Sequence, residues 1–369
     1  MKRCIVYCPY EILEQGDGAR MLRPRKMIQA FRDIGYDVFV IHGYSKARRK
    51  LIAECKKMVK DGTKFEFMYI ENSTEPTLLT DPHHLPTHPF LDYGFYQFAK
   101  RHGIPMGLFY SDIFWKFDTY GRDLPKWKRF FALRCYELDL KMLPKYLKKF
   151  YLPDKMMNSY LKVPYLAERS EELPPGCEQT KVKDRGPAPV DFSERPLQLF
   201  YVGGLGGFYQ IGELISAVAG EPDVFLTVCC RKAEWEKESV NLSKLLADNV
   251  SIIHKKGKEL EPYFEKTDLC SLMFLPGSYM SFAKPFKAYE YLANEIPVLS
   301  SKGTAIGEFV ERSNIGWNID YSAEEIRKVI RAIKENPGLL QEKRDNCRTV
   351  KQSQLWTARA KQVEEGLLK

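Results

Sequence analysis

The chain has 369 residues, of which 44% are hydrophobic and 13% aromatic, so it is long enough for about two globular domains and too apolar to be disordered. Its formal charge of +9 favours anionic partners such as nucleotides, nucleic acid or an acidic lipid surface. Nine cysteines without a CxxC spacing predict reduced thiols in the cytoplasm, and no apolar run approaches the ~18 residues of a membrane span.

The first half of the chain alternates predicted strands with predicted helices. A strand at 4–10 is followed by the loop EQGDG (14–18), and apolar residues then recur with helical spacing over 21–34. Strands that alternate with helices at this spacing indicate a parallel, doubly wound sheet. The remaining predicted elements are strands at 36–42, 65–70 and 104–110, a helix at 92–102, and a closing turn, ELPPGCE (172–178).

The second half repeats this organisation after a charged, proline-rich segment at 179–195, which is predicted to link two domains. Its predicted strands lie at 196–202, 224–230, 250–254, 269–275 and 297–301, and its predicted helices at 211–220, 285–294 and about 352–367. We therefore predict an α/β protein with two Rossmann-like domains. Their bounds are 1–178 and 196–350, with a separate C-terminal helix within 351–369.

The stretch YVGGLGGFYQ (201–210) places four glycines directly after a strand: Gly203, Gly204, Gly206 and Gly207. Glycine is favoured where the backbone needs positive φ or a close approach. A dinucleotide fingerprint requires a third glycine where Tyr209 stands, and a carboxylate where the next strand ends in Arg231. A structural turn and a cradle for a diphosphate remain, and the number of glycines favours the cradle.

The segment AKPFKAYEYLANEIPVLSSKGTAIGEFVERSNIGW (283–317) carries polar side chains within about one helical turn. Lys287, Glu290 and Tyr291 project toward a common region, near the edge of the sheet where ligands bind. A carboxylate at Glu290 can accept from two ribose hydroxyls and Lys287 can pair with phosphate, each bond being worth roughly 1.5–3 kcal/mol. An exposed Lys–Glu pair, worth only ~0.3 kcal/mol, is the alternative.

The pattern P-x-K-x-x-E-Y-x-A, followed by P-V, a glycine loop and a later Gly-Trp, resembles the donor-binding segment of GT-B glycosyltransferases, specifically the retaining family 4. PLQLFYVGGL (196–205) is similar to the opening strand of their donor domain. ELPPGCE is similar to the turn that ends their acceptor domain, and QSQLWTARAKQVEE (352–365) to the helix that crosses back onto the first domain. The resemblance implies two Rossmann-like domains facing a cleft, and it covers most of the chain.

The resemblance also implies roles for particular residues. Glu290 is similar to the second Glu of the family's Glu-x7-Glu motif, which holds the nucleotide ribose, whereas Phe282 stands at the first Glu. The family's Lys-Gly after the glycine loop is missing, so the phosphate charge falls to Arg231 and Lys287; a solvated strand end is the alternative for Arg231. The implied donor site comprises Gly203, Gly204, Gly206, Gly207, Arg231, Ser278, Ser281, Lys287, Glu290, Gly303 and Thr304.

The first half supplies candidates for the acceptor or phosphate side. Gly18, Arg20 and Arg23 lie where cations oppose a helix macrodipole, so an anion facing them is one interpretation and a solvated helix face the other. Asp112 follows a strand and is the candidate to orient or deprotonate an acceptor hydroxyl, with a helix cap as its alternative and Asp92 as a second candidate. The predicted catalytic residues are Asp112, Arg231 and Lys287.

Two further segments bear on cofactors and partners. His83, His84 and His88 do not have a zinc spacing, and GT-B enzymes generally work without a bound metal, so the resemblance implies no cofactor. Basic and aromatic residues interleave over 126–151, which suits an anionic membrane surface or, alternatively, a buried helix pair with solvated lysines. No nucleic-acid recognition module accompanies this segment, so nucleic acid is not an expected partner.

The resemblance implies a glycosyltransferase of bacterial surface-polysaccharide biosynthesis. It would move a hexose from a nucleotide diphosphate sugar, with UDP favoured over GDP, to a hydroxyl of a glycan or lipid-linked glycan, with retention and without metal. It would be cytoplasmic and peripheral at the inner face of the membrane. The alternatives are a nucleotide-sugar epimerase of the same fold and a non-catalytic protein that binds nucleotide sugars or glycans, which Phe282 favours.

Overall fold

The computed structural model describes residues 1–13, 19–180 and 191–369, and these divide into two compact units. The first unit comprises Met1–Pro175 and Trp356–Lys369, and the second comprises Gly176–Leu355. The loop predicted at 14–18 and the part of the predicted linker at 181–190 lie outside the described residues. Each unit contains its own parallel sheet and its own buried core.

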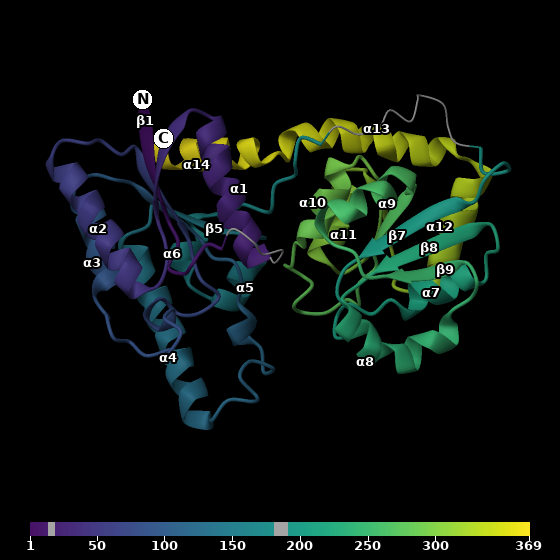
Figure 1. Ribbon diagram of the computed structural model, residues 1–369, viewed down its shortest axis with the longest axis horizontal. Coiled ribbons are helices and arrows are strands. Elements are labelled where there is room, and N and C mark those ends of the chain that lie inside the picture. Colours follow the sequence, from purple (N-terminus) through teal and green to yellow (C-terminus); the bar gives the residue numbers. More distant parts are fainter. Residues whose placement is uncertain (14–18, 181–190) are drawn as a thin grey trace. The chain divides into compact units, whose positions relative to one another are not determined.

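In the described part of the first unit, six strands form a parallel sheet in the order β2-β1-β3-β4-β5-β6 (Figure 1). These strands are β1 (Lys2–Tyr7), β2 (Tyr36–Ile41), β3 (Phe67–Glu71), β4 (Met106–Phe109), β5 (Lys149–Leu152) and β6 (Ser170–Glu172). β1 ends in a fully buried apolar run, CIVY, because a parallel sheet is covered on both faces and its strands need not alternate with polar residues.

The helices of the first unit are α1 (Ala19–Asp33), α2 (Ser45–Lys60), α3 (Leu91–Arg101), α4 (Lys126–Met142), α5 (Met157–Leu161), α6 (Pro164–Ala167) and α14 (Trp356–Leu368), with 3₁₀ turns η1 (Thr77–Leu79), η2 (Phe114–Lys116) and η3 (Leu143–Lys145). α14 packs on α1 and contacts β3 and β4, so the last helix completes the core of the first unit, as the resemblance implied. The alternative of a helix pair over 126–151 is wrong, because α4 is followed by η3 and then by β5.

In the described part of the second unit, six strands form a parallel sheet in the order β12-β11-β10-β7-β8-β9. They are β7 (Leu197–Val202), β8 (Val224–Cys229), β9 (Val250–Ile253), β10 (Leu269–Leu272), β11 (Val298–Ser301) and β12 (Gly316–Ile319). Counted within the unit, this is the strand order 3-2-1-4-5-6 of Rossmann folds. The doubly wound parallel sheets predicted from the sequence are therefore present in both units.

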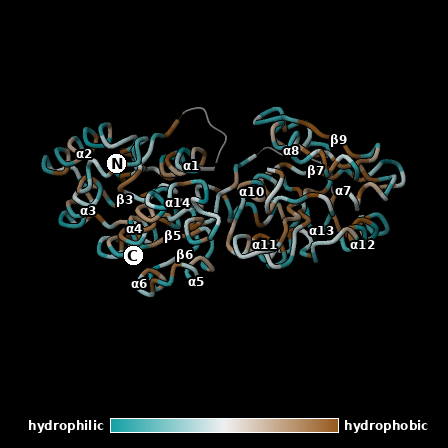
Figure 2. The backbone as a smooth tube through the Cα atoms, turned by 90° about the horizontal axis from the view of Figure 1, so that it is seen from below, coloured by the Kyte–Doolittle hydropathy of each residue, from teal (hydrophilic) through white to brown (hydrophobic). Residues whose placement is uncertain are grey.

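The second sheet is flanked by α7 (Gly212–Ala219), α8 (Lys232–Leu242), α9 (Glu261–Lys266), α10 (Phe286–Ala293), α11 (Ala305–Arg312), α12 (Ala323–Glu335) and α13 (Gly338–Ser353), with η4 (Ser243–Leu245) and η5 (Gly257–Leu260). Figure 2 shows apolar chain, in brown, along the strands inside each unit, and largely hydrophilic chain, in teal, on outer helices such as α2. The helix predicted at about 352–367 is interrupted, because α13 ends at Ser353 and α14 begins at Trp356.

Candidate functional site

The order of the second sheet reverses between β7 and β10, which are neighbours although two strands separate them in sequence. In open α/β sheets, ligands bind beyond the carboxyl ends of the strands at such a reversal. The glycine loop follows β7, and the loop that carries Ser278 and Ser281 follows β10. Both predicted donor loops therefore begin at the reversal, and α10, with Lys287 and Glu290, follows the second of them.

Two buried tyrosines hold the start of the glycine loop. The hydroxyl of Tyr201 donates to the Gly204 carbonyl at 2.6 Å. The hydroxyl of Tyr291, on α10, accepts from the Val202 amide at 2.9 Å and donates to the Val202 carbonyl at 3.3 Å. Burial raises the pKa of both phenols well above the usual value, so both remain neutral donors. The loop is therefore tied to its own strand and to α10.

Three of the four glycines are required by the fold itself, one by close packing and two by their backbone conformation. A Cβ on Gly203 would lie 2.6 Å from the Tyr201 hydroxyl, and Gly206 and Gly207 have φ of +85° and +60°. Gly206 exchanges two backbone hydrogen bonds with Tyr209, so the glycines form a hairpin ahead of α7 and do not open its first turn. A Cβ on Gly204 would make only ordinary contacts, the nearest at 3.5 Å. The packing of the chain therefore does not require a glycine at Gly204, and its place in a donor site stays a prediction.

Lys287 and Glu290 form an ion pair of 2.5 Å on α10, and their side chains are 32% and 36% exposed. Both charges act on the end of β8: burial raises the pKa of the Cys229 thiol there, Lys287 opposes this shift and Glu290 adds to it. The structure therefore brings the predicted ribose and phosphate ligands together with the end of a second strand. It also shows them bonded to each other, which was the alternative interpretation.

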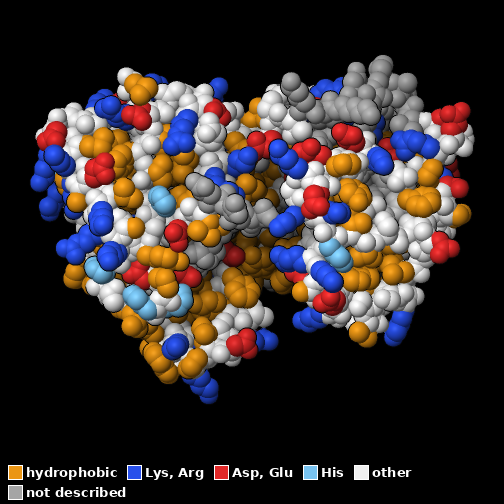
Figure 3. Space-filling view, viewed as in Figure 1, with side chains coloured by type: hydrophobic (Ala, Val, Ile, Leu, Met, Phe, Trp, Pro, Cys, Tyr) orange, Lys and Arg blue, Asp and Glu red, His pale blue; other side chains and the backbone are white. Residues whose placement is uncertain are grey.

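Cationic side chains gather at this edge of the second sheet. Figure 3 shows them in blue on the side of the second unit toward which the arrows of β7, β8 and β9 point in Figure 1. Arg231 follows β8, precedes α8 and is 77% exposed; exposed lysines at 255, 256 and 258 follow β9. Sequence reasoning missed these lysines, although the string KKGK directly after a strand was a signal for them. Together the cations favour an anionic ligand.

Arg231 is engaged by a carboxylate that the sequence analysis also missed. Its Nε donates to Glu234 Oε1 at 2.7 Å, and its Nη2 contacts the same oxygen. The other oxygen of Glu234 accepts from the Leu205 amide in the glycine loop at 3.2 Å. The i,i+3 spacing of Arg231 and Glu234 could have indicated the pair, but not its contact with the loop.

The remaining predicted donor residues are mostly engaged within the chain. Phe282 is 2% exposed and packs against Tyr279 with ring centroids 5.1 Å apart, so an aromatic core residue occupies this position. Ser281 Oγ donates to the Ser278 carbonyl at 2.8 Å. Thr304 is the N-cap of α11: its hydroxyl accepts from the Gly307 amide at 3.0 Å and donates to the Ser301 carbonyl. Gly303, with φ of +73°, leads into this cap.

Arg23 and Asp92, predicted to face an anion or an acceptor, are buried in the first unit. Arg23 is 4% exposed, pairs with Glu71 at 3.0 Å and stacks 3.5 Å above the Phe109 ring. Asp92 is equally buried, and both of its oxygens accept from Arg48, at 3.1 and 3.2 Å. These side chains have structural partners in place of the expected ligands, because an unpaired buried charge is costly.

Asp112 adopts the cap geometry that was its alternative interpretation. Its Oδ1 accepts from the Phe114 amide at 2.8 Å, at the start of η2, and the side chain is partly exposed. Gly18 lies outside the described residues; Arg20 lies in the first turn of α1, and its role stays a prediction. The structure thus brings the donor residues of the second unit to one edge, but it does not gather the candidates of the first unit around one point.

α4 has two different faces. Its inner face packs against η1 and η3 and includes the buried side chains Ala132, Cys135, Tyr136, Asp139 and Leu140. Its outer face carries side chains at helical spacing, namely Trp127, Phe130, Phe131 and Leu138, which are 65%, 60%, 41% and 39% exposed. Figure 3 shows orange hydrophobic side chains gathered over the region of α4. We call these four residues the α4 apolar stripe.

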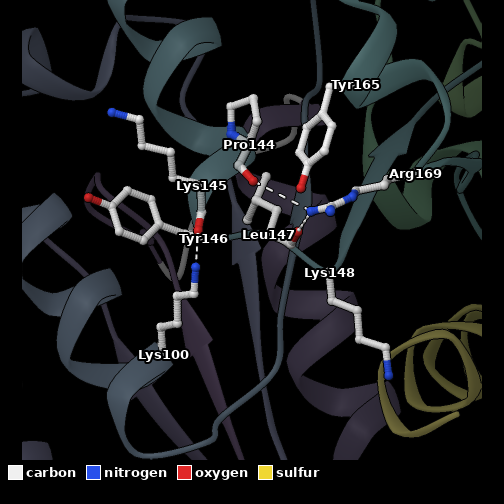
Figure 4. A pocket seen from close by; sticks show the side chains of 8 residues that line it. All are labelled: Lys100, Pro144, Lys145, Tyr146, Leu147, Lys148, Tyr165 and Arg169. Carbon is white, nitrogen blue, oxygen red and sulfur yellow. Dashed lines mark hydrogen bonds between the residues drawn. The ribbon is translucent and has the colours of Figure 1, made fainter.

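A pocket elsewhere on the first unit is lined by Lys100, Pro144, Lys145, Tyr146, Leu147, Lys148, Tyr165 and Arg169 (Figure 4). Lys100 donates to the Lys145 carbonyl at 2.6 Å and Arg169 to the Leu147 carbonyl at 2.7 Å. The amino groups of Lys145 and Lys148 point away from each other (Figure 4). The cations here brace the turn before β5 and do not converge on a common ligand position.

The described residues offer neither a metal-binding cluster nor a membrane-spanning helix. No group of three or more His, Cys, Asp or Glu side chains in this part of the chain is arranged to hold a metal ion. Among the same residues, no helix has both the length and the apolar character needed to cross a membrane.

Residues 273–353 match the family described as glucosyltransferase 3-like, C-terminal domain. This segment contains Ser278, Ser281, Lys287, Glu290, Gly303 and Thr304, so all of the predicted donor residues after β10 lie in it. No curated protein matches the sequence at a significant level.

Solved structures match both units together. HepE from Anabaena, in complex with UDP and glucose, is 13% identical, with 98% of each chain covered and a TM-score of 0.62. Sucrose-phosphate synthase from Thermosynechococcus elongatus is 14% identical over 99% and 98% of the two chains, with a TM-score of 0.63. A glycosyltransferase from Rickettsia africae is 10% identical over 100% and 99%, with a TM-score of 0.65.

These findings define the class of the protein. The structural likeness shows the GT-B fold, and the domain match shows a glycosyltransferase domain within that fold. The chain therefore has the fold of GT-B glycosyltransferases, as the sequence resemblance predicted, and one segment of it matches a glucosyltransferase 3-like domain. Its place in the retaining family 4 stays a prediction.

Proposed function

We propose that the protein transfers a hexose from a nucleotide diphosphate sugar, UDP-linked in preference to GDP-linked, to a hydroxyl of a glycan or lipid-linked glycan. The observation that carries the proposal is the position of Lys287 and Glu290, next to the end of β8 and directly after the loop at the sheet reversal, within the matched glycosyltransferase domain. The neighbour HepE has been solved with UDP-glucose, which supports UDP as the nucleotide.

In this proposal each group has a defined task. Glu290 accepts hydrogen bonds from the ribose hydroxyls, and the diphosphate lies against the glycine loop at Gly204. Arg231 and Lys287 offset the charge that develops on the departing diphosphate, without a metal. The acceptor oxygen forms a bond to the anomeric carbon on the face from which the phosphate oxygen leaves, and that oxygen takes the acceptor proton. The configuration is thereby retained.

The acceptor side is the less defined part of the proposal. Asp112 remains the candidate to orient the acceptor hydroxyl, because its side chain is partly exposed at the carboxyl end of β4. The α4 apolar stripe, flanked by Lys126, Lys128 and Arg134, supports a peripheral position on an anionic membrane, where a lipid-linked acceptor would be found. The setting is then the cytoplasmic face of that membrane, in polysaccharide biosynthesis.

Nucleotide binding tests the proposal directly. A ligand stabilises the folded protein by about 2.7 kcal/mol when present at about 100 times its Kd. We therefore expect UDP, as the preferred nucleotide, to raise the melting temperature of the wild type more than GDP does, and NADP, which does not bind, to have no effect. Glu290→Ala should lower UDP affinity by about tenfold or more, because charge-assisted hydrogen bonds are lost. Glu236→Ala, which removes a carboxylate from exposed α8, should leave UDP affinity unchanged.

Three results would contradict this function. Stabilisation by NADP and by no sugar nucleotide would point to a dinucleotide enzyme. Unchanged UDP affinity in Glu290→Ala would show that Glu290 on α10 does not bind the ribose. Incubation with UDP-glucose in the absence of any acceptor should release UDP slowly and leave the sugar as glucose. A sugar epimer in that incubation would identify an epimerase instead.

A further inference from the structure

The carboxylates of α8 lie against the glycine loop. Glu234 Oε2 accepts from the Leu205 amide at 3.2 Å, while Oε1 accepts from Arg231. One turn later, Glu238 approaches the same loop, since a Cβ placed on Gly206 would lie 2.6 Å from Glu238 Oε1. An acidic face of α8 therefore covers the loop on which a diphosphate is expected to lie.

The partners of Glu234 are those that a phosphate oxygen would use. Backbone amides of glycine loops and guanidinium groups are the common ligands of phosphate. A Cβ placed on Gly204 would lie 3.6 Å from Arg231 Nη2 and 3.6 Å from Glu234 Oε2, so the cation and the carboxylate meet over this glycine. Gly204 is also the glycine that the fold itself does not require. The Glu234 carboxylate thus lies where a phosphate of the donor would be expected to bind.

The contact could instead be a permanent brace, since glutamate is favourable in the first turn of a helix. The exposure of the ion pair argues against this. Arg231 is 77% exposed and Glu234 25% exposed, and an ion pair at the surface contributes little to stability. A diphosphate bound at Gly204 would repel the Glu234 carboxylate, whose Oε2 lies 3.6 Å from the place that a Cβ on Gly204 would take. The two anions therefore exclude each other.

We propose that Glu234 occupies the phosphate position when no donor is bound, and that the donor diphosphate displaces it. On displacement, the Leu205 amide and the Arg231 guanidinium pass from the carboxylate to the phosphate oxygens. Glu234 then sets donor affinity, because every binding event must first break its bonds to the loop and to Arg231. The inference rests on the proposed function, in particular on a nucleoside diphosphate at the glycine loop.

The test compares UDP affinity in the wild type, Glu234→Gln and Glu236→Gln by titration calorimetry. Glutamine keeps an oxygen that can accept from the Leu205 amide but carries no charge, so it removes the competition and retains the hydrogen bond. We expect Glu234→Gln to bind UDP about tenfold more tightly. Glu236 pairs with Lys232 on the exposed side of α8, so Glu236→Gln controls for the change in net charge and should bind UDP like the wild type.

The two roles considered for Glu234, a structural brace and a competitor of phosphate, predict different changes of UDP affinity in Glu234→Gln. If Glu234 braced the loop, Glu234→Gln would bind UDP equally well or more weakly, and either result overturns the inference while leaving the proposed function standing. A wild type that binds neither UDP nor GDP would overturn both. Circular dichroism confirms that the variant is folded. If it is not, Glu234→Asp, whose shorter side chain withdraws the carboxylate from the loop, carries the same expectation of tighter binding.

Discussion

Gly203 and Gly204 are adjacent in the sequence, but their surroundings give them different roles. The hydrogen atom of Gly203 faces the ring and hydroxyl of Tyr201, which is fully buried and bonded to the Gly204 carbonyl. The space beside Gly204 holds only the outer ends of Tyr209, Arg231 and Glu234. The first glycine therefore serves the fold, and the second leaves room at the surface of the loop.

Alanine at each position separates these roles. Gly203→Ala should lower the free energy of unfolding by about 1–3 kcal/mol, because the new methyl group overpacks a rigid, buried tyrosine. Gly204→Ala should leave stability within about 0.5 kcal/mol of the wild type and should weaken UDP binding, because its methyl group occupies the surface on which the phosphates lie. Urea unfolding and UDP titration measure the two effects. Wild-type UDP affinity in Gly204→Ala would place the phosphates elsewhere.

Sequence reasoning succeeded at residues whose partners are close in the chain. Lys287 and Glu290 are one helical turn apart, so their proximity follows from the helix alone. Arg23 was predicted to face an anion because cations oppose the macrodipole at the start of a helix, and Asp92 was the second candidate to face an acceptor. Their partners, Glu71 and Arg48, lie 48 and 44 residues away and meet them only in the folded unit. Charge in a sequence does not reveal burial when the compensating charge is distant.

At the scale of elements, Asp139 joins three segments of the first unit. It lies on the inner face of α4 and is fully buried. One oxygen accepts from the amide and the hydroxyl of Thr77 in η1, at 2.8 and 3.1 Å, and the other accepts from the Tyr93 hydroxyl on α3. Burial raises the pKa of Asp139 to about 6; the hydrogen bonds from Tyr93 and Thr77 oppose the shift and nearby Asp92 adds to it.

This pKa predicts a pH dependence of stability. The folded state keeps the proton of Asp139 up to about pH 6, whereas the unfolded chain releases it near its ordinary pKa of 3.8. The contribution of Asp139 to stability is therefore fully present below about pH 4 and is lost as the pH rises through about 6. Over that interval Asp139→Asn should gain about 3 kcal/mol relative to the wild type.

Urea unfolding of both proteins at several pH values between about 4 and 7 measures this difference. Asp112→Asn, at a partly exposed cap, is the matched control and should follow the wild type more closely. A constant difference between wild type and Asp139→Asn across the range would mean that Asp139 is ionised in the folded state at low pH.

Elements were predicted well where they are long or strongly apolar. β1, β7 and β8 each contain at least four apolar residues among six, and each was placed to within a few residues. β5, β6 and β12 were missed, although strands of four residues such as β9 and β10 were predicted; β6 reads SEE, which carries no strand signal of its own. Such strands are held by their neighbours in the sheet, and this information is not local. The donor edge was predictable because glycines and polar residues follow its longer strands.

At the scale of the whole molecule, the charge of +9 and the α4 apolar stripe predict binding to anionic membranes. We expect the protein to sediment with vesicles of phosphatidylglycerol but much less with phosphatidylcholine, and about 0.5 M salt should weaken the binding by screening. Trp127→Ser combined with Phe130→Ser should reduce vesicle binding by tenfold or more, since burial of each ring is worth roughly 1.5–3 kcal/mol.

Phe225→Ser is the matched control, because Phe225 is also exposed, at 42%, but lies on β8 in the second unit. Its vesicle binding should equal that of the wild type. Retention of full vesicle binding by the Trp127 and Phe130 variant would show that α4 does not contact the lipid.

The assignment of Trp356–Leu368 to the first unit has a consequence for how the protein is made. A ribosome produces this helix only after the entire second unit, whereas domains usually fold in the order in which they are synthesised. Until α14 has been synthesised, the first unit lacks this helix, and the surface of α1 that α14 contacts is uncovered. The second unit, contiguous from Gly176 to Leu355, is complete before this helix is made, so it can fold before the first unit has all of its residues.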